Sequence, residues 1–147
     1  MTLGEIMSRH VITVGLDHEL SALRRLFDEH RFHHVLVVDE GRLRGVISDR
    51  DVLREMSPFI DTLGERAQDL ATLHKKAHQI MSRKLLVAHR DESIADAATR
   101  MLGHSVSCLP VVTQRGDVEG IVSWKDLIRA LVGLRAEERE TPDVVRR

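Results

Sequence analysis

The sequence predicts an α+β fold in which two copies of a β-α-β-β-α unit pack about a pseudo-twofold axis. The first reason is an internal repeat, because Ile-Met-Ser-Arg at 6–9 returns 74 residues later at 80–83. The second is that later segments match in the same order: 35–38 with 109–112 and, after one inserted residue, 45–51 with 120–126. The third is that each copy alternates short β-branched runs with one-sided apolar stripes, which are typical of strands and helices.

Length and composition fit a folded domain of ordinary size. The chain has 147 residues, 42% of them hydrophobic, and its charged residues nearly cancel to a formal charge of -1. Because no net positive field is available to attract phosphate backbones, we expect no nucleic-acid partner. The apolar runs are much shorter than the roughly 20 residues that span a bilayer, so we expect no membrane association. A single cysteine, Cys108, and no secretory signal pattern favour a cytoplasmic protein.

Each unit is expected to begin with a strand, at 11–14 and at 85–88, followed by an amphipathic helix. Asp17 and Asp91 stand where the N-caps of these helices are expected. The apolar residues that follow share the i, i+3, i+7 spacing of a helix with one buried face: Leu20, Leu23 and Phe27 in the first copy, and Ile94, Ala97 and Met101 in the second.

A β-hairpin and a second helix complete each unit. The hairpin strands are expected at 35–38 with 44–47 and at 109–112 with 119–122, joined by turns that contain Gly41 and Gly116. The second helices should begin at Ser48 and Ser123. The inner face of such a small sheet is not covered by its own two helices, so the two copies should pack on each other.

The domain boundaries follow from the repeat: a first unit at 1–57, a helical connector at 58–79, a second unit at 80–134 and a charged C-terminal tail at 135–147. The connector carries apolar residues and a histidine on one helical stripe, which predicts a connecting helix: Leu63, Ala67, Leu70, His74 and Ala77. The stripe is explained either by docking on the module's own surface or by a dimer contact. The tail contains Pro142 and is expected to fray.

Ser48-x-x-Asp51 and its copy Ser123-x-x-Asp126 are the most informative motifs, since each stands where a strand turns into a helix. One interpretation is a capping box, in which the serine and the acidic side chain satisfy helix N-terminal NH groups. The other is a ligand site, in which the carboxylate accepts hydrogen bonds from two adjacent ribose hydroxyls while the serine and NH groups hold a phosphate.

Ile-Met-Ser-Arg, Leu-Pro-Val-Val and Gly-Ile-Val-Ser-x-x-Asp-Leu, occurring in this order and in closely related form in both copies, resemble the CBS domain family, named after cystathionine beta-synthase. The resemblance covers residues 6–56 and 80–133. It implies two repeats about a pseudo-twofold axis with two clefts between them, where adenosine compounds such as AMP, ATP or S-adenosylmethionine often bind. It also implies that two such pairs form a flat dimer.

The resemblance further implies that each cleft combines the Ser-x-x-Asp of one repeat with the first strand and the start of the second strand of the other. Asp126 and Ser123 would then face Thr13, Phe32 and His33. The second cleft would bring together Asp51 and Ser48 with Val87, Val106 and Ser107. We expect the first cleft to be the better adenosine site, because Thr13 offers a hydroxyl where Val87 offers none.

Candidate partners for phosphate are the basic residues in and near the motifs: Arg50, Lys125, His33 and His34. For Arg50 and Lys125 a solvated helix face is an equally good explanation. The second repeat has Ser107 and Cys108 where the first has the two histidines, which disfavours polyphosphate binding from that side. The spacing of His30, His33 and His34 crosses from a helix end into a strand, so we expect no metal site.

The sequence leaves three functions to consider. The favoured one is a regulatory module that binds an adenine nucleotide, requires no cofactor, forms a homodimer and signals to a separate protein partner in trans. The alternative is a ligand-free interaction and dimerisation module, in which both motifs only cap helices. An enzyme, for example a metal-dependent hydrolase using Asp49, Asp51 and nearby histidines, is the weakest hypothesis. No nucleophile, base and oxyanion donors occur in a recognisable order, and no catalytic residue is expected.

Overall fold

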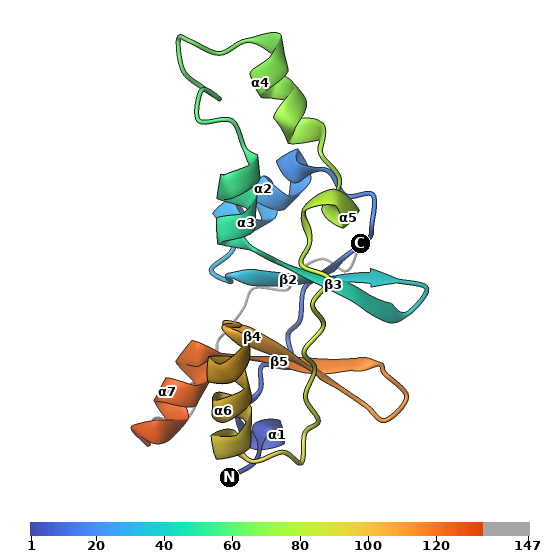
Figure 1. The fold of residues 1–147 in the computed structure, drawn as a ribbon, viewed down its shortest axis with the longest axis vertical. Coiled ribbons are helices and arrows are strands. Elements are labelled where there is room, and N and C mark those ends of the chain that lie inside the picture. The colour runs from blue at the N-terminus through green and yellow to red at the C-terminus, as the bar shows by residue number, and fades with distance from the viewer. Residues whose placement is uncertain (134–147) are drawn as a thin grey trace.

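The computed structural model describes residues 1–133, so the predicted tail at 135–147 lies outside the described residues. Figure 1 shows two stacked halves, each a small sheet with helices on its outer side. The helices and strands have these bounds: α1 Leu3–Ile6, β1 Thr13–Val14, α2 Leu20–Glu29, β2 His34–Asp39, β3 Arg42–Ser48, α3 Asp49–Glu55, α4 Ala67–Ala71, the 3-10 helix η1 Thr72–His74, α5 Ala77–Ile80, α6 Ile94–His104, β4 Cys108–Val112, β5 Val118–Ser123 and α7 Trp124–Leu131.

The two sheets are related copies. In the first half β1 pairs in parallel with β2, and β2 pairs with β3 in an antiparallel hairpin. In the second half β4 and β5 form the matching hairpin, and Ala88 makes a single parallel bridge to Val111 where a strand at 85–88 was expected. The hairpin predictions are therefore confirmed, whereas the first strand of the second unit is reduced to one bridge.

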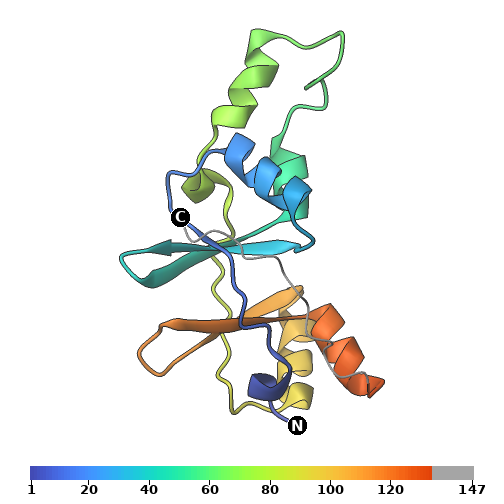
Figure 2. The ribbon, with the colours of Figure 1, turned by 180° about the vertical axis from the view of Figure 1, so that it is seen from behind.

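The first helix of each unit packs on the opposite half. Leu3 of α1 lies in the core of the second half with Ala97 and Met101, while Ala77 of α5 lies in the core of the first half with Leu20. Figure 2 shows the chain leaving α1 in one half and crossing to β1 in the other. The two units are thus interlocked through their first segments.

Two glycines make this crossing possible. A Cβ at Gly45 would stand 2.5 Å from the Sδ of Met81, and a Cβ at Gly120 would stand 2.8 Å from the Sδ of Met7. Backbone bridges hold the crossing segments next to these glycines, Ser82 with Val46 and Ser8 with Ile121. The same contact between a methionine and a glycine therefore packs the crossing segment in both halves.

The inner faces of the two sheets pack on each other, as predicted. Leu36, Leu43 and Val112 are buried between them, with Val87 and Val118 partly buried at the margin. Burial of these aliphatic side chains removes apolar surface that neither half covers with its own helices.

The predicted N-caps Asp17 and Asp91 are wrong. The helices begin two residues later than expected, after Glu19 and after Ser93, whose Oγ accepts a hydrogen bond from the NH of Asp96. The reason is long-range: the carbonyl of His18 accepts from the NH of Ala77, and an equivalent bond joins the second half to α1. This pairing keeps the backbone extended past the aspartates.

The predicted single connecting helix is also wrong. The segment contains α4, the 3-10 helix η1 and the start of α5, interrupted at Lys75 and Lys76. Lys76 forms an isolated bridge with Glu19, so the chain is extended where the stripe predicted helix. Of the stripe, Ala77 is buried in the first half's core and Leu63 is fully exposed. None of the helices described within residues 1–133 is long and apolar enough to cross a membrane.

Candidate functional site

Both Ser-x-x-Asp motifs form hydrogen-bonded caps at the start of α3 and α7. In α3 the NH of Asp51 donates to Ser48 Oγ at 3.1 Å, and the NH of Ser48 donates to Asp51 Oδ2 at 2.8 Å. In α7 the NH and the hydroxyl of Ser123 both donate to Asp126 Oδ2, at 2.8 and 3.0 Å. The capping interpretation is therefore confirmed for both motifs.

The caps use one carboxylate oxygen of each aspartate. Asp51 Oδ1 lies 3.6 Å from an Arg54 nitrogen, and Asp126 Oδ1 lies 3.6 Å from an Arg129 nitrogen. These distances exceed a hydrogen bond, and the two carboxylates remain partly exposed, 23% for Asp51 and 15% for Asp126. Each second oxygen can therefore accept further hydrogen bonds without loss of the cap.

The start of α7 contacts the first half through His33. Lys125 Nζ lies 2.9 Å from His33 Nε2, and His33 Nδ1 lies 2.8 Å from Asp49 Oδ2. An ammonium group only donates, so Nε2 is the acceptor and the protonated Nδ1 donates to the carboxylate. The structure thus brings together two predicted members of the first cleft, and Lys125 is not merely a solvated residue.

The start of β2 contacts the second half through His34. His34 Nε2 lies 2.9 Å from the hydroxyl oxygen of Ser107. Burial raises the pKa of the Cys108 thiol to about 12, and the negative charge of nearby Asp51 adds to this shift. The membership of Asp51 and Ser48 in the second predicted cleft stays a prediction.

The expectation that His34 supplies a positive charge is not supported. Its imidazole is partly buried, and loss of hydration lowers its pKa below the ordinary 6.5; Asp49 and Asp51 oppose this shift, and His33 reinforces it. His34 is therefore neutral near pH 7 and acts as a hydrogen-bonding residue between the halves. Cys108 is a buried free thiol.

The remaining predicted residues are placed as follows. Thr13 is exposed in β1 opposite Leu36. Phe32 packs on the first half's core and stacks on His30, with ring centroids 5.5 Å apart. Val87 borders the apolar cluster between the sheets, and Val106 packs on the second core. Arg50 is exposed on α3. No contact between Thr13 or Phe32 and Asp126 is present among the described residues, so their role in the first cleft stays a prediction.

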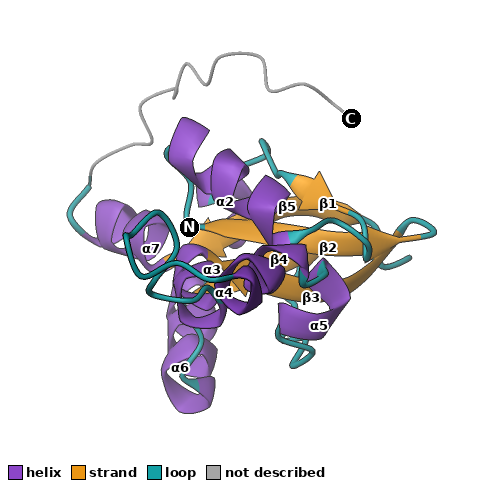
Figure 3. Cartoon of the chain, turned by 90° about the horizontal axis from the view of Figure 1, so that it is seen from above, coloured by secondary structure: helices purple, strands orange, loops and turns teal. Residues whose placement is uncertain are grey.

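Sequence reasoning missed Arg54 and Arg129, which face the free carboxylate oxygens. The signal was available, because each arginine follows the motif aspartate by three residues in both copies. Asp49, which orients His33, was considered only for the weakest hypothesis. Figure 3 shows α3 and α7 beginning at the end of the strands opposite the hairpin turns, so both motifs lie at the same end of the sheets.

Comparison with known proteins identifies the family. The CBS domain profile matches residues 3–58 and 77–133. A CBS domain-containing protein of Dictyostelium discoideum is 31% identical over 130 residues, which cover 87% of this chain and 89% of that protein. A homoserine O-acetyltransferase of Methanohalophilus mahii is also 31% identical, over 90% of this chain but only 25% of the enzyme. Most of that enzyme lies outside the matched segment.

Solved structures of similar proteins have the same fold as this chain. The CBS domain pair of protein MJ0100, in complex with 5'-methylthioadenosine and S-adenosylmethionine, has a TM-score of 0.75 and 28% identity, covering 90% of this chain and 97% of that one. CBSX2 in complex with AMP has a TM-score of 0.73 and 26% identity, with the same coverage. CBS domain pairs are regulatory modules. The profile match over both repeats, the related sequences and the shared fold show that this chain belongs to the CBS domain family.

Proposed function

We propose that this chain is a regulatory module that binds an adenine nucleotide in the clefts between its two CBS repeats and passes the bound state to a separate protein. The observation that carries the proposal is that Oδ1 of Asp126 and of Asp51 takes no part in the cap and makes only a long ion pair with an arginine, at 3.6 Å. The start of α7 also contacts the opposite half through Lys125 and His33, so Asp126 Oδ1 can accept hydrogen bonds from ribose hydroxyls of a ligand bound there. The similar pairs that hold S-adenosylmethionine or AMP support this assignment.

We expect the cleft of Asp126 to bind more tightly. Lys125 is held by His33 across the halves and supplies a cation for phosphate, and Thr13 supplies a hydroxyl. In the other cleft Arg50 is the available cation, while His34 is bonded to Ser107. A nucleotide that contacts both halves stabilises the arrangement of the two halves that binds it best. A partner protein would respond to this change in arrangement.

The test is calorimetry and thermal shift with AMP, ADP, ATP, S-adenosylmethionine and GTP, since a ligand that binds the native state raises the melting temperature. Asp126→Asn keeps one oxygen for the cap but replaces the other acceptor by an NH2 group. We expect it to weaken adenine nucleotide binding by about tenfold or more. Asp96→Asn is the control, because Asp96 follows the N-cap serine of α6, Ser93, by three residues and is not among the residues predicted to bind ligand.

The alternative of a ligand-free module is supported by the same capping boxes, which explain both motifs without a ligand. It predicts that Asp51→Ala and Asp126→Ala, which remove the cap, lower the melting temperature and that none of the five compounds raises it. Unchanged affinity of AMP and ATP for the double variant would remove the ribose assignment.

We further propose that the module is a cytoplasmic homodimer. Leu53 on α3 and its repeat equivalent Ile128 on α7 are both more than half exposed, which favours a shared apolar contact. The buried thiol of Cys108 is compatible with a reducing compartment. Light scattering on the wild type and on Leu53→Glu/Ile128→Glu tests the dimer, and a monomeric mass for both proteins would reject it.

A further inference from the structure

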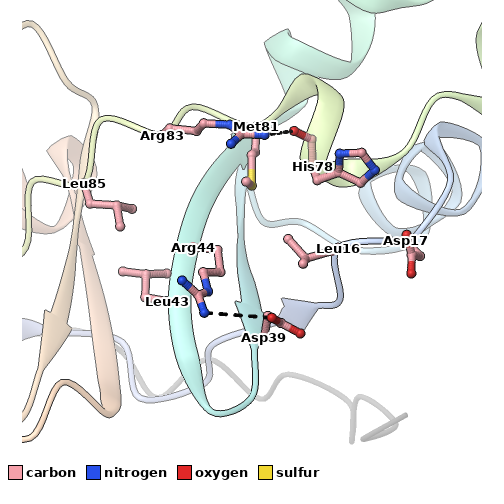
Figure 4. A pocket seen from close by; sticks show the side chains of 9 residues that line it. All are labelled: Leu16, Asp17, Asp39, Leu43, Arg44, His78, Met81, Arg83 and Leu85. Atoms are coloured by element: carbon pink, nitrogen blue, oxygen red, sulfur yellow. Dashed lines mark hydrogen bonds and ion pairs between the residues drawn. The ribbon is translucent and has the colours of Figure 1, made fainter.

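A cavity of about 600 Å³ lies at the opposite end of the first hairpin from the Ser48 motif. Figure 4 shows it bordered by side chains from the hairpin, from α5 and from the chain that leaves α5. Its apolar wall consists of Leu16, Leu43, Met81 and Leu85, and its cationic residues are Arg44 and Arg83. Its size is within the range of small-molecule sites, and it combines apolar walls with a few charged groups.

The second half contains the same backbone at this position. The NH of His78 donates to the carbonyl of Leu16 at 3.0 Å, and in the second half the NH of Gly4 donates to the carbonyl of Arg90 at 2.9 Å. Met81 lies against Gly45 as Met7 lies against Gly120. The backbone therefore follows the same path at the two positions, and only the side chains differ. The second half can serve as a comparison for the first.

In the second half Arg90 stands at the position of Leu16, and its side chain lies against Gly4. Its Cβ lies 3.2 Å from the point where a Cβ on Gly4 would stand, so the small residue makes room for it. Its guanidinium lies 3.5 Å from Glu119. The first half has Leu16 in place of this arginine, Arg44 in place of the glutamate and His78 in place of the glycine. These three differences remove the arginine side chain from this position and place Arg44 on the wall of the cavity.

The charges define a ligand class. Arg44 is only loosely paired, 3.9 Å from Asp39 Oδ2. Arg83 donates to the backbone carbonyl of His78 at 2.9 Å and, within residues 1–133, has no carboxylate within 4 Å. Asp17 and Asp39 also line the cavity, so two arginines face two carboxylates. This balance favours a singly charged group over a phosphate dianion, and the planar guanidinium suits a carboxylate.

We propose that this cavity binds a small organic carboxylate with an aliphatic body, the carboxylate on Arg83 and Arg44 and the body on the leucines and Met81. The site is independent of the nucleotide clefts and does not depend on the function proposed for them. Because its floor is Met81, which packs on Gly45 at the crossing between the halves, an occupant contacts the segment that interlocks the two units.

The test is NMR of the full chain carrying 13C-methyl methionine, with the Met81 signal assigned by Met81→Leu. 4-Methylpentanoate should shift this signal in a saturable manner, whereas the isosteric alcohol and amine should not. Isopentyl phosphate should bind more weakly than the carboxylate. Arg83→Gln should weaken the carboxylate by about tenfold or more, as expected for a charge-assisted hydrogen bond.

Leu16→Arg/Arg44→Glu/His78→Gly installs the residues of the second half and should abolish binding by filling the cavity. Arg83→Gln provides the same test if this triple variant does not fold. Asp126→Asn should leave 4-methylpentanoate binding unchanged, which separates this site from the nucleotide clefts. The proposal is overturned if the Met81 signal does not respond to the carboxylate, responds equally to the alcohol, or responds in the triple variant as in the wild type.

Discussion

His33 and Lys125, one from each half of the module, are joined by a hydrogen bond of 2.9 Å in which the imidazole is the acceptor. Asp49 fixes the tautomer by accepting from the other ring nitrogen. The bond holds a lysine ammonium at the start of α7, next to the cap made by Ser123 and Asp126. The cation is therefore positioned before any ligand arrives, and a phosphate group there would exchange a neutral acceptor for an anionic one.

Lys125→Gln should weaken AMP binding by about tenfold or more while leaving adenosine unaffected, because only the phosphate uses the ammonium group. Arg50→Gln is the matched variant, since Arg50 holds the equivalent position in the first repeat. Calorimetry with both ligands measures the effect. Equal losses for AMP and adenosine would show that Lys125 stabilises the cleft structure and does not bind phosphate.

The free energy of unfolding should fall as pH decreases below about 6.5. Burial lowers the pKa of His34 in the folded state, so the unfolded chain takes up this proton first. The contribution is complete above the unfolded pKa and is lost between that value and the lower folded pKa. Urea denaturation of wild type and His34→Gln between pH 5 and 8 should show a steeper decrease for the wild type. Parallel curves would assign the pH dependence to other groups.

Gly45→Ala and Gly120→Ala should each destabilise the fold by about 1–3 kcal/mol, because the new methyl group overlaps a packed methionine. The effect should be larger at Gly120, where the carbonyl oxygen of Ser8 also stands 2.8 Å from the added carbon. Gly103→Ala is the control, since nothing lies within 4 Å of its added Cβ and alanine favours helix by up to about 1 kcal/mol. Chemical denaturation measures all three. Destabilisation by Gly103→Ala as large as by Gly45→Ala would argue against the packing explanation.

Cys108 should react slowly with iodoacetamide at pH 8 in the native protein and rapidly after unfolding. Its thiol is buried, and its pKa is raised to about 12, so little thiolate is present. Mass spectrometry of timed samples gives the rate. The urea-denatured protein is the control, and rapid native labelling would contradict the burial at the start of β4.

Local features could be predicted from the sequence. The hairpins at 35–47 and 109–122 follow from short apolar runs around Gly41 and Gly116, whose positive φ of 76° and 89° suits glycine. The caps at Ser48 and Ser123 involve residues three positions apart. The helix starts could not be predicted in the same way, because Asp17 and Asp91 are good caps that long-range backbone pairing overrides.

By itself, the sequence determined the two repeats, their order of elements, the family and the two capping motifs, since periodicity, turn residues and caps act over a few neighbouring positions. Only the tertiary structure decided the exchange of α1 and α5 between the halves, the interruption of the connector and the bond between His33 and Lys125. It also decided that Arg44 and Arg83 border one pocket, while Arg90 of the second half lies against Gly4. Each of these depends on segments far apart in the chain, which backbone pairing and burial bring together.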